Sequence, residues 1–95
     1  MPMTDDRAEP IGPGLAGTYM VEGFWPGVTR GQFESAASLA GLQNAATCLE
    51  LILIPEDEIV LGIFRGPSLA AVSDACRRAG LPCERIVETV RVRPG

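Results

Sequence analysis

Hydrophobic residues change their spacing several times between Gly17 and Val92, and these changes divide the chain into predicted elements. Four stretches are dense in β-branched, aromatic and other apolar residues, a composition typical of β-strands. They cover residues 18–24, 47–54, 58–65 and 84–92. Two stretches between them repeat apolar residues every three or four positions, which is the spacing of an amphipathic helix. The pattern predicts the order strand, helix, strand, strand, helix, strand.

Both predicted helices carry recognisable end signals. Thr29 and Gln32 form a capping box at the start of the first helix, which ends near Gly41. Its apolar face consists of Phe33, Ala36, Ala37 and Ala40. Ser68 is the predicted N-cap of the second helix, and Gly80-Leu81-Pro82 matches a Schellman-type stop. The apolar face of the second helix consists of Leu69, Val72, Ala75, Cys76 and Ala79.

Turn residues connect the remaining elements. Trp25-Pro26-Gly27 ends the first strand, because proline has no N–H to donate to the sheet. Pro55-Glu56-Asp57 joins the second and third strands as an antiparallel hairpin. Two helical crossovers, each expected to be right-handed, complete the chain path. The predicted fold is α+β: a ferredoxin-like βαββαβ sandwich, with a four-stranded antiparallel sheet and two helices on one face.

The predicted strands are apolar on both faces. Side chains of a strand alternate between its two faces. In the second strand, one face is expected to carry Leu49, Leu51 and Leu53, and the other Cys48, Glu50, Ile52 and Ile54. The last strand divides into Ile86, Glu88, Val90 and Val92 against Val87, Thr89 and Arg91. Strands of this kind need cover on both faces, and the helices supply only one cover. A second copy would supply the other, which predicts a homodimer of the dimeric α+β barrel type. The alternative is a sheet whose polar residues suffice for an exposed face.

Residues 1–16 differ in composition from the rest of the chain. They contain Pro2, Pro10 and Pro13 together with acidic residues, and they lack an apolar stretch that a signal peptide would need. This composition predicts a disordered N-terminal arm followed by one domain over residues 17–95. The three cysteines, an odd number without a C-x-x-C motif, favour a reducing cytoplasmic location. No run of apolar residues is long enough to predict a membrane span.

Charge and residue content exclude several function classes. The net charge is −4, and the basic residues, all arginines, are scattered, which argues against nucleic-acid binding. Histidine is absent, so no Ser-His-Asp or Cys-His catalytic arrangement can form within the chain. The sequence contains neither a G-x-x-x-x-G-K-[ST] nor a G-x-G-x-x-G loop for phosphates. Nothing in the sequence calls for a cofactor.

Three carboxylates stand out within the predicted sheet: Glu22, Glu50 and Glu88. Glu22 and Glu88 have apolar neighbours two residues away on either side, and a shared apolar chamber would raise their pKa values and mark a binding site. The alternative is that each glutamate pairs with a nearby arginine. Four aromatic residues are candidates for lining a small-ligand pocket, although such residues more often belong to the core: Tyr19, Phe24, Trp25 and Phe64. The thiols of Cys48, Cys76 and Cys83 are weaker candidates for a soft metal.

A set of short segments runs from about residue 18 to residue 92: Tyr19-Met20-Val21-Glu22, Pro26-Gly27-Val28-Thr29, Ile54-Pro55-Glu56-Asp57-Glu58, Pro67-Ser68-Leu69-Ala70-Ala71-Val72, Arg78-Ala79-Gly80-Leu81-Pro82 and Arg85-Ile86-Val87-Glu88. These segments resemble a bacterial family of small proteins of unknown function that includes a nickel-responsive, nickel-binding member. The most specific part of the resemblance is the pair of segments that begin at Arg78 and Arg85. The resemblance implies a ferredoxin-like homodimer and nickel binding, with Glu22 and Glu88 at positions where the family tends to carry glutamate. This chain has no histidine for such a metal site, so no metal ligand is carried over.

The sequence leaves three functions open. The first is a homodimeric binding protein that holds a small molecule or a metal ion, nickel included, against the open sheet, with Glu22, Glu50 and Glu88 as its few polar groups. The second is a small cofactor-free enzyme of the cyclase, isomerase or oxygenase type, which rests on analogy of fold. The third is a module that uses its sheet surface for contacts with another protein.

Overall fold

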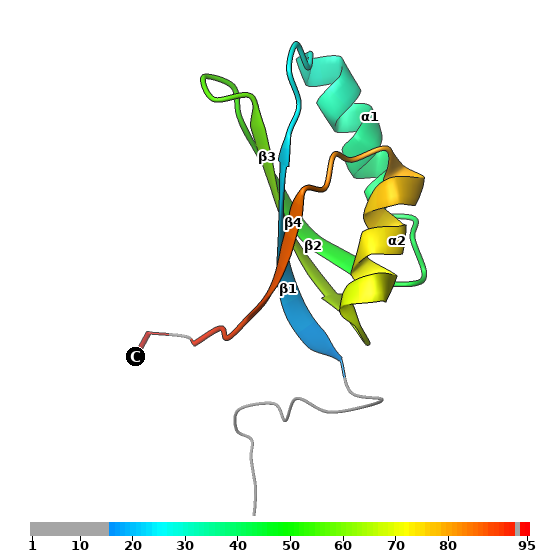
Figure 1. Ribbon diagram of the computed structural model, residues 1–95, viewed down its shortest axis with the longest axis vertical. Coiled ribbons are helices and arrows are strands. Elements are labelled where there is room, and N and C mark those ends of the chain that lie inside the picture. The colour runs from blue at the N-terminus through cyan, green and yellow to red at the C-terminus, as the bar shows by residue number, and fades with distance from the viewer. Residues whose placement is uncertain (1–15, 93) are drawn as a thin grey trace, which may run out of the picture.

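The computed structural model describes residues 16–92 and 94–95 and confirms the predicted order of elements (Figure 1). The elements are β1 (Gly17–Phe24), α1 (Arg30–Ala40), β2 (Thr47–Ile54), β3 (Ile59–Gly66), α2 (Leu69–Ala79) and β4 (Arg85–Thr89). The fold is therefore α+β and ferredoxin-like. The predicted disordered arm lies outside the described residues, apart from Ala16.

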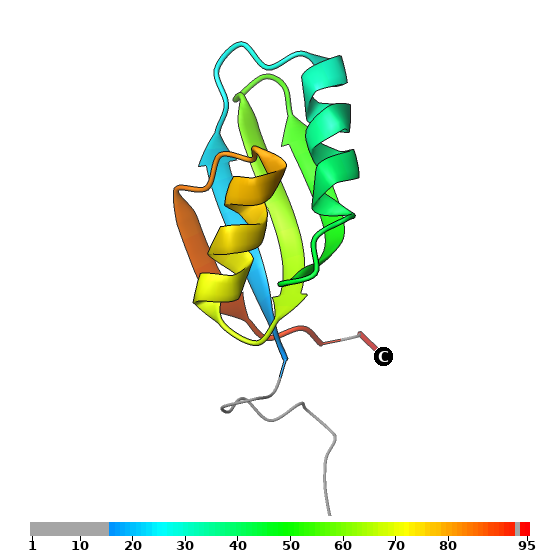
Figure 2. The ribbon, with the colours of Figure 1, turned by 90° about the vertical axis from the view of Figure 1, so that its right-hand side faces the viewer.

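The sheet has the strand order β2-β3-β1-β4, and each pair of adjacent strands is antiparallel. Each helical crossover therefore connects two strands that run in the same direction and are separated by one strand between them. Both helices lie on the same side of the sheet, as Figures 1 and 2 show, and the opposite side carries no further layer among the described residues. We call this uncovered side the open face.

The helix ends form as their local sequences predict. The Thr29 side chain accepts from the Gln32 backbone N–H at 3.1 Å, and Gln32 Oε1 accepts from the Thr29 N–H at 2.9 Å, which completes the capping box. Gly80 adopts a left-handed conformation with φ of 76°. The Leu81 N–H donates to the Cys76 carbonyl at 2.9 Å, so α2 ends in the predicted Schellman turn.

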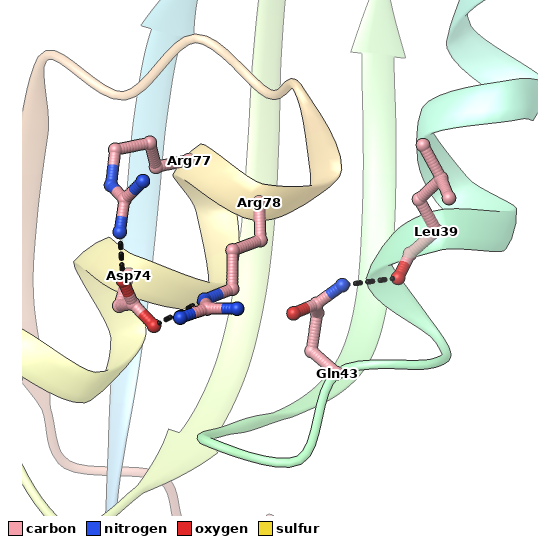
Figure 3. A network of polar contacts seen from close by, with 5 residues as sticks. All are labelled: Leu39, Gln43, Asp74, Arg77 and Arg78. Atoms are coloured by element: carbon pink, nitrogen blue, oxygen red, sulfur yellow. Dashed lines mark hydrogen bonds and ion pairs between the residues drawn. The ribbon is translucent and has the colours of Figure 1, made fainter.

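The exposed side of α2 carries a small ion cluster (Figure 3). Asp74 contacts Arg77 and accepts from Arg78 Nε at 2.8 Å. The hydrogen bond from Arg78 and the positive charges of both arginines lower the pKa of the Asp74 carboxyl. Near the end of α1, Gln43 Nε2 donates to the Leu39 carbonyl at 3.0 Å. These contacts lie at the surface and contribute little to stability.

The core lies between the helices and the sheet. Its fully buried side chains include Phe64 from β3 together with Val72 and Cys76 from α2. The loop before β4 crosses closely over β1 at Gly23, where a Cβ atom would lie 2.2 Å from the Pro82 carbonyl oxygen. Glycine at this position therefore lets the α2–β4 connection close over the end of the core.

Apart from shifts of one residue at strand ends, two predicted strand details differ from the structure. β4 ends at Thr89 rather than at residue 92, because the last pair it forms with β1 is Thr18 opposite Thr89. In β2, Cys48 lies opposite Phe64 whereas Glu50 lies opposite Ile63, so Leu49 is an extra residue in a β-bulge. The bulge shifts the alternation by one residue, and Cys48 packs against the core instead of sharing the face of Glu50.

Candidate functional site

The open face is the candidate functional site, and strand register defines its members. Met20 lies opposite Ile63 on one side and Val87 on the other. Because directly paired residues share a face, these three side chains point away from the helices. The same reasoning places eight apolar residues on the open face: Met20, Phe24, Ile52, Ile54, Ile59, Leu61, Ile63 and Val87.

These eight residues form a continuous apolar surface across all four strands. Phe24 keeps 48% and Ile52 keeps 41% of its surface exposed, and the other six are half-buried by their neighbours within the sheet. Large apolar side chains gathered on one uncovered face are typical of an interaction or ligand-binding surface. The geometry therefore supports binding at this face through apolar contact.

Glu22 is the most central acidic group of the open face. It lies on β1 between Leu61 and Arg85, and its carboxylate is 3.7 Å from Arg85 Nη1. Both side chains are partly exposed, so this ion pair contributes little to stability and leaves the arginine free to reorient. For Glu22, the structure shows the arginine pairing that the sequence left as one of two alternatives.

Glu50 also lies on the open face, opposite Ile63 on the edge strand β2. It is exposed, and within the described part of the chain no arginine lies within 4.0 Å of it. The face thus has an acidic edge at β2 and a basic group, Arg85, at the opposite edge on β4. Arg65 is a second basic group on this face, between Thr47 and Thr18.

Glu88 lies on the other side of the sheet. Its partner on β1 is Tyr19, a residue of the core under the helices. A Cβ atom placed on Gly17 would lie 3.4 Å from the Glu88 carboxylate, which locates that carboxylate at the rim of the helix-covered face. The structure therefore brings Glu22 and Glu50 to one face and separates Glu88 from them, so Glu22 and Glu88 do not share an apolar chamber within one chain.

Three of the four aromatic candidates belong to the core and its border. Tyr19 and Phe64 are buried under the helices, and Trp25 packs against the same core cluster. The Trp25 backbone N–H donates to the Glu58 carbonyl at 2.7 Å, and the Gly27 N–H donates to the Glu58 carboxylate at 2.8 Å. Glu58, which has a φ of 56°, thus ties the β2–β3 turn to the β1–α1 turn. The fourth candidate, Phe24, lies on the open face opposite Ile59.

The cysteine thiols lie on the helix side of the sheet. Cys76 is fully buried, and Cys48 and Cys83 pack against the same core. Burial, with a smaller effect from the neighbouring Cys83 thiol, raises the pKa of Cys76 to about 12. Burial also raises the pKa values of Cys48 and Cys83. Thiols with raised pKa values remain protonated at neutral pH and are weak nucleophiles and weak metal ligands.

Residues 16–92 and 94–95 lack two further kinds of feature. No group of three or more cysteine, aspartate and glutamate side chains in this part of the chain is arranged to hold a metal ion. No helix there is long and apolar enough to cross a membrane. Models of known protein families give no match to this chain, and curated protein sequences give none either.

Sequence reasoning missed most of the residues that make up the open face. Met20, Leu61 and Ile63 appear in the sequence as ordinary strand residues, and their spacing matches that of the core positions beside them. Pairing decides which set faces the helices. Glycine residues are the sequence signal that distinguishes the two faces. Gly23, Gly62 and Gly66 all lie on the helix-covered face, where a side chain would have little space.

Proposed function

We propose that this protein is a homodimeric binding protein in which two copies pack open face to open face and hold a small, mainly apolar molecule between their sheets. The observation that carries the proposal is the uncovered apolar surface opposite the helices (Figures 1 and 2). A second copy is the cover that supplies a matching apolar surface of the same size. Glu22 and Glu50 are the few polar groups that would orient a bound molecule, as is usual in such pockets.

The open face has about the size that a small dimer interface needs. Three of its strands contain eight residues and β4 contains five. At spacings of ~4.8 Å between strands and ~3.3 Å between residues, these strands cover roughly 460 Å² in each copy. Two copies would therefore bury about 900 Å², close to the lower bound of ~1,000 Å² for a specific interface.

The charges on the open face are self-complementary. A two-fold axis between the sheets and roughly along the strands places the β2 edge of one copy over the β4 edge of the other. Glu50 of each copy then faces the edge that carries Arg85 of the other. Two sheets can pack in this aligned manner with a modest angle between their strands. The pairing supports a symmetric dimer, since the same contact forms twice.

Assembly is tested by a matched pair of substitutions on the two sides of the molecule. Ile52 on the open face is 41% exposed, and Leu39 on α1 is 46% exposed. We expect Ile52→Arg to abolish the dimer in analytical ultracentrifugation, because the symmetric arrangement places residue 52 opposite the edge that carries Arg85, so that like charges meet in the interface. Leu39→Arg, the control, should leave the dimer intact. A wild-type protein that stays monomeric at 100 µM, or equal effects of both substitutions, would contradict the proposal.

The bound molecule is tested by native mass spectrometry and by a neutral apolar fluorescent probe, N-phenyl-1-naphthylamine. We expect one probe molecule per dimer and a loss of binding in Ile63→Glu, which changes the centre of the open face. Protein incubated with nickel serves as the second sample. Nickel retained at a fixed ratio by a dimer that ignores the probe would contradict the apolar ligand and favour the metal alternative.

A further inference from the structure

Strand β3 presents a run of apolar side chains on the open face that ends in an arginine. It carries Ile59, Leu61 and Ile63, all half-buried, followed by the exposed Arg65. At ~3.3 Å per residue, the run from Ile59 to Arg65 extends over about 20 Å. One strand of the open face is therefore apolar along most of its length and positively charged at one end.

Arg65 lies among hydroxyl groups. Its direct neighbours are Thr47 on β2 and Thr18 on β1, and Thr89 follows on β4. In the part of the chain that the structure describes, no carboxylate lies within 4.0 Å of the Arg65 guanidinium. A guanidinium group and hydroxyl groups all donate hydrogen bonds, and a carboxylate accepts them. This end of the open face is therefore suited to an anion.

The other charged groups of the open face have partners of opposite charge. Glu22 lies 3.7 Å from Arg85, a contact that draws its carboxylate toward the β4 edge and away from β3. In the proposed dimer, Glu50 on the β2 edge faces the edge that carries Arg85 of the other copy. Among the described residues of this face, Arg65 is thus the basic group whose charge is left for a bound molecule.

The proposed two-fold axis brings the Arg65 residues of both copies to the same end of the interface. Because the axis runs along the strands, each residue keeps its level, and Arg65 on β3 lies across from Thr18 on β1 of the other copy. With ~4.8 Å between strands and ~10 Å between sheets, the Cα atoms of the two arginines are about 11 Å apart. Both guanidinium groups can therefore reach one anion, which matches the expected ratio of one bound molecule per dimer.

We propose that the molecule held between the sheets is an unbranched apolar monocarboxylate, with its carboxylate at Arg65 and its chain along the apolar residues of β3. This inference rests on the proposed function and assigns the chemical class of its ligand. An arginine donates two parallel hydrogen bonds to a carboxylate, and the chain covers apolar surface that water would otherwise contact. A single negative charge fits this face, because Glu22 and Glu50 would repel a second one.

The experiment compares decanoate with decan-1-ol, which has the same chain without the charge, as competitors of N-phenyl-1-naphthylamine at neutral pH. In the wild type, we expect decanoate to bind at least tenfold more tightly than decan-1-ol. Arg65→Gln should reduce this ratio below twofold, whereas Arg65→Lys, which keeps the charge, should preserve most of it. Arg30→Gln is the matched control, because Arg30 on α1 is 89% exposed and pairs with Glu34. It should keep the wild-type ratio.

The outcomes separate this inference from the proposed function. Equal affinities of decanoate and decan-1-ol in the wild type, or a preference that survives Arg65→Gln, would overturn the carboxylate and leave the apolar ligand standing. A wild-type protein that binds neither the probe nor, by calorimetry, decanoate would overturn both. Circular dichroism should show the same secondary structure in all variants, so that a change in affinity is not a change in folding.

Discussion

The role of Cys76 follows from its burial and not from the reactivity of its thiol. It occupies the apolar face of α2 and has no exposed surface. Its burial opposes ionisation, which raises the pKa of the thiol from 9.0 to about 12. Cys76 therefore acts as a small hydrophobic residue, as the sequence pattern of the helix indicates.

This burial predicts a loss of stability at alkaline pH. Below pH 9 both the folded and the unfolded thiol hold their proton, so the stabilisation is complete. As the pH rises from about 9 toward 12, the unfolded chain releases the Cys76 proton while the folded chain keeps it, and the free energy of unfolding falls by at most ~1.4 kcal/mol per pH unit. Urea unfolding in the presence of a reductant, at pH 8.0, 9.5 and 10.5, measures the slope. Cys76→Ala should show a shallower slope over this range, and parallel slopes would show that the thiol is not shielded.

The glutamates show which residue-scale features the sequence could not decide. Their position in strands was predictable from spacing, whereas their face depends on the partner strand. Glu22 and Glu88 separate because β1 and β4 pair with Thr18 opposite Thr89, which places Glu88 opposite Tyr19. No local property of either glutamate encodes that register, since it is set by long-range pairing.

At the scale of elements, the helices follow from local signals. Ser68 precedes α2, and its Oγ accepts from the Ala71 N–H at 3.1 Å, as its position before the apolar pattern predicts. Thr29 and Gln32 act in the same way for α1. The end of β4 and the bulge in β2 were not predictable, because each depends on where a neighbouring strand stops or loses register. Elements with internal hydrogen bonds are therefore easier to locate from sequence than elements that share bonds with distant residues.

The N-cap of α2 gives a prediction at this scale. Ser68→Ala removes the acceptor for the Ala71 N–H and should lower the free energy of unfolding by about 1 kcal/mol. Ser73→Ala, on the exposed side of the same helix, is the control and should change stability by less than ~0.5 kcal/mol, as is usual for surface substitutions. Thermal and urea unfolding of the three proteins measure the difference. Equal effects of the two substitutions would show that the cap does not stabilise α2.

At the scale of the whole molecule, a thin domain presents one covered and one uncovered face. The helices bury the face with Tyr19, Val21 and Phe64, and they leave the face with Met20, Leu61 and Ile63 to solvent. A domain of this size buries little apolar surface by itself, and in the proposed dimer the second copy would cover the open face. The sequence predicted an apolar open face from strands that are apolar on both faces. It could not predict the charge pattern at the edges, which emerges only when strand order places Glu50 and Arg85 at opposite sides.

That charge pattern predicts an energetic coupling across the proposed dimer. Glu50→Gln and Arg85→Gln should each weaken association, because each removes one partner of a contact that forms twice by symmetry. The double variant should lose less than the sum of the single losses, and we expect a coupling of about 1 kcal/mol per dimer for partly exposed pairs. Sedimentation equilibrium of the wild type and the three variants at low and high salt measures this coupling, which should shrink at high salt as screening increases.

A second double-mutant cycle is the comparison, because Arg85 also contacts Glu22 in its own chain. We expect the coupling between Glu22→Gln and Arg85→Gln to be smaller than that between Glu50→Gln and Arg85→Gln. If the losses of association free energy in Glu50→Gln and Arg85→Gln simply add in the double variant, the two side chains do not interact across the dimer. The two sheets would then have to pack in a different relative orientation.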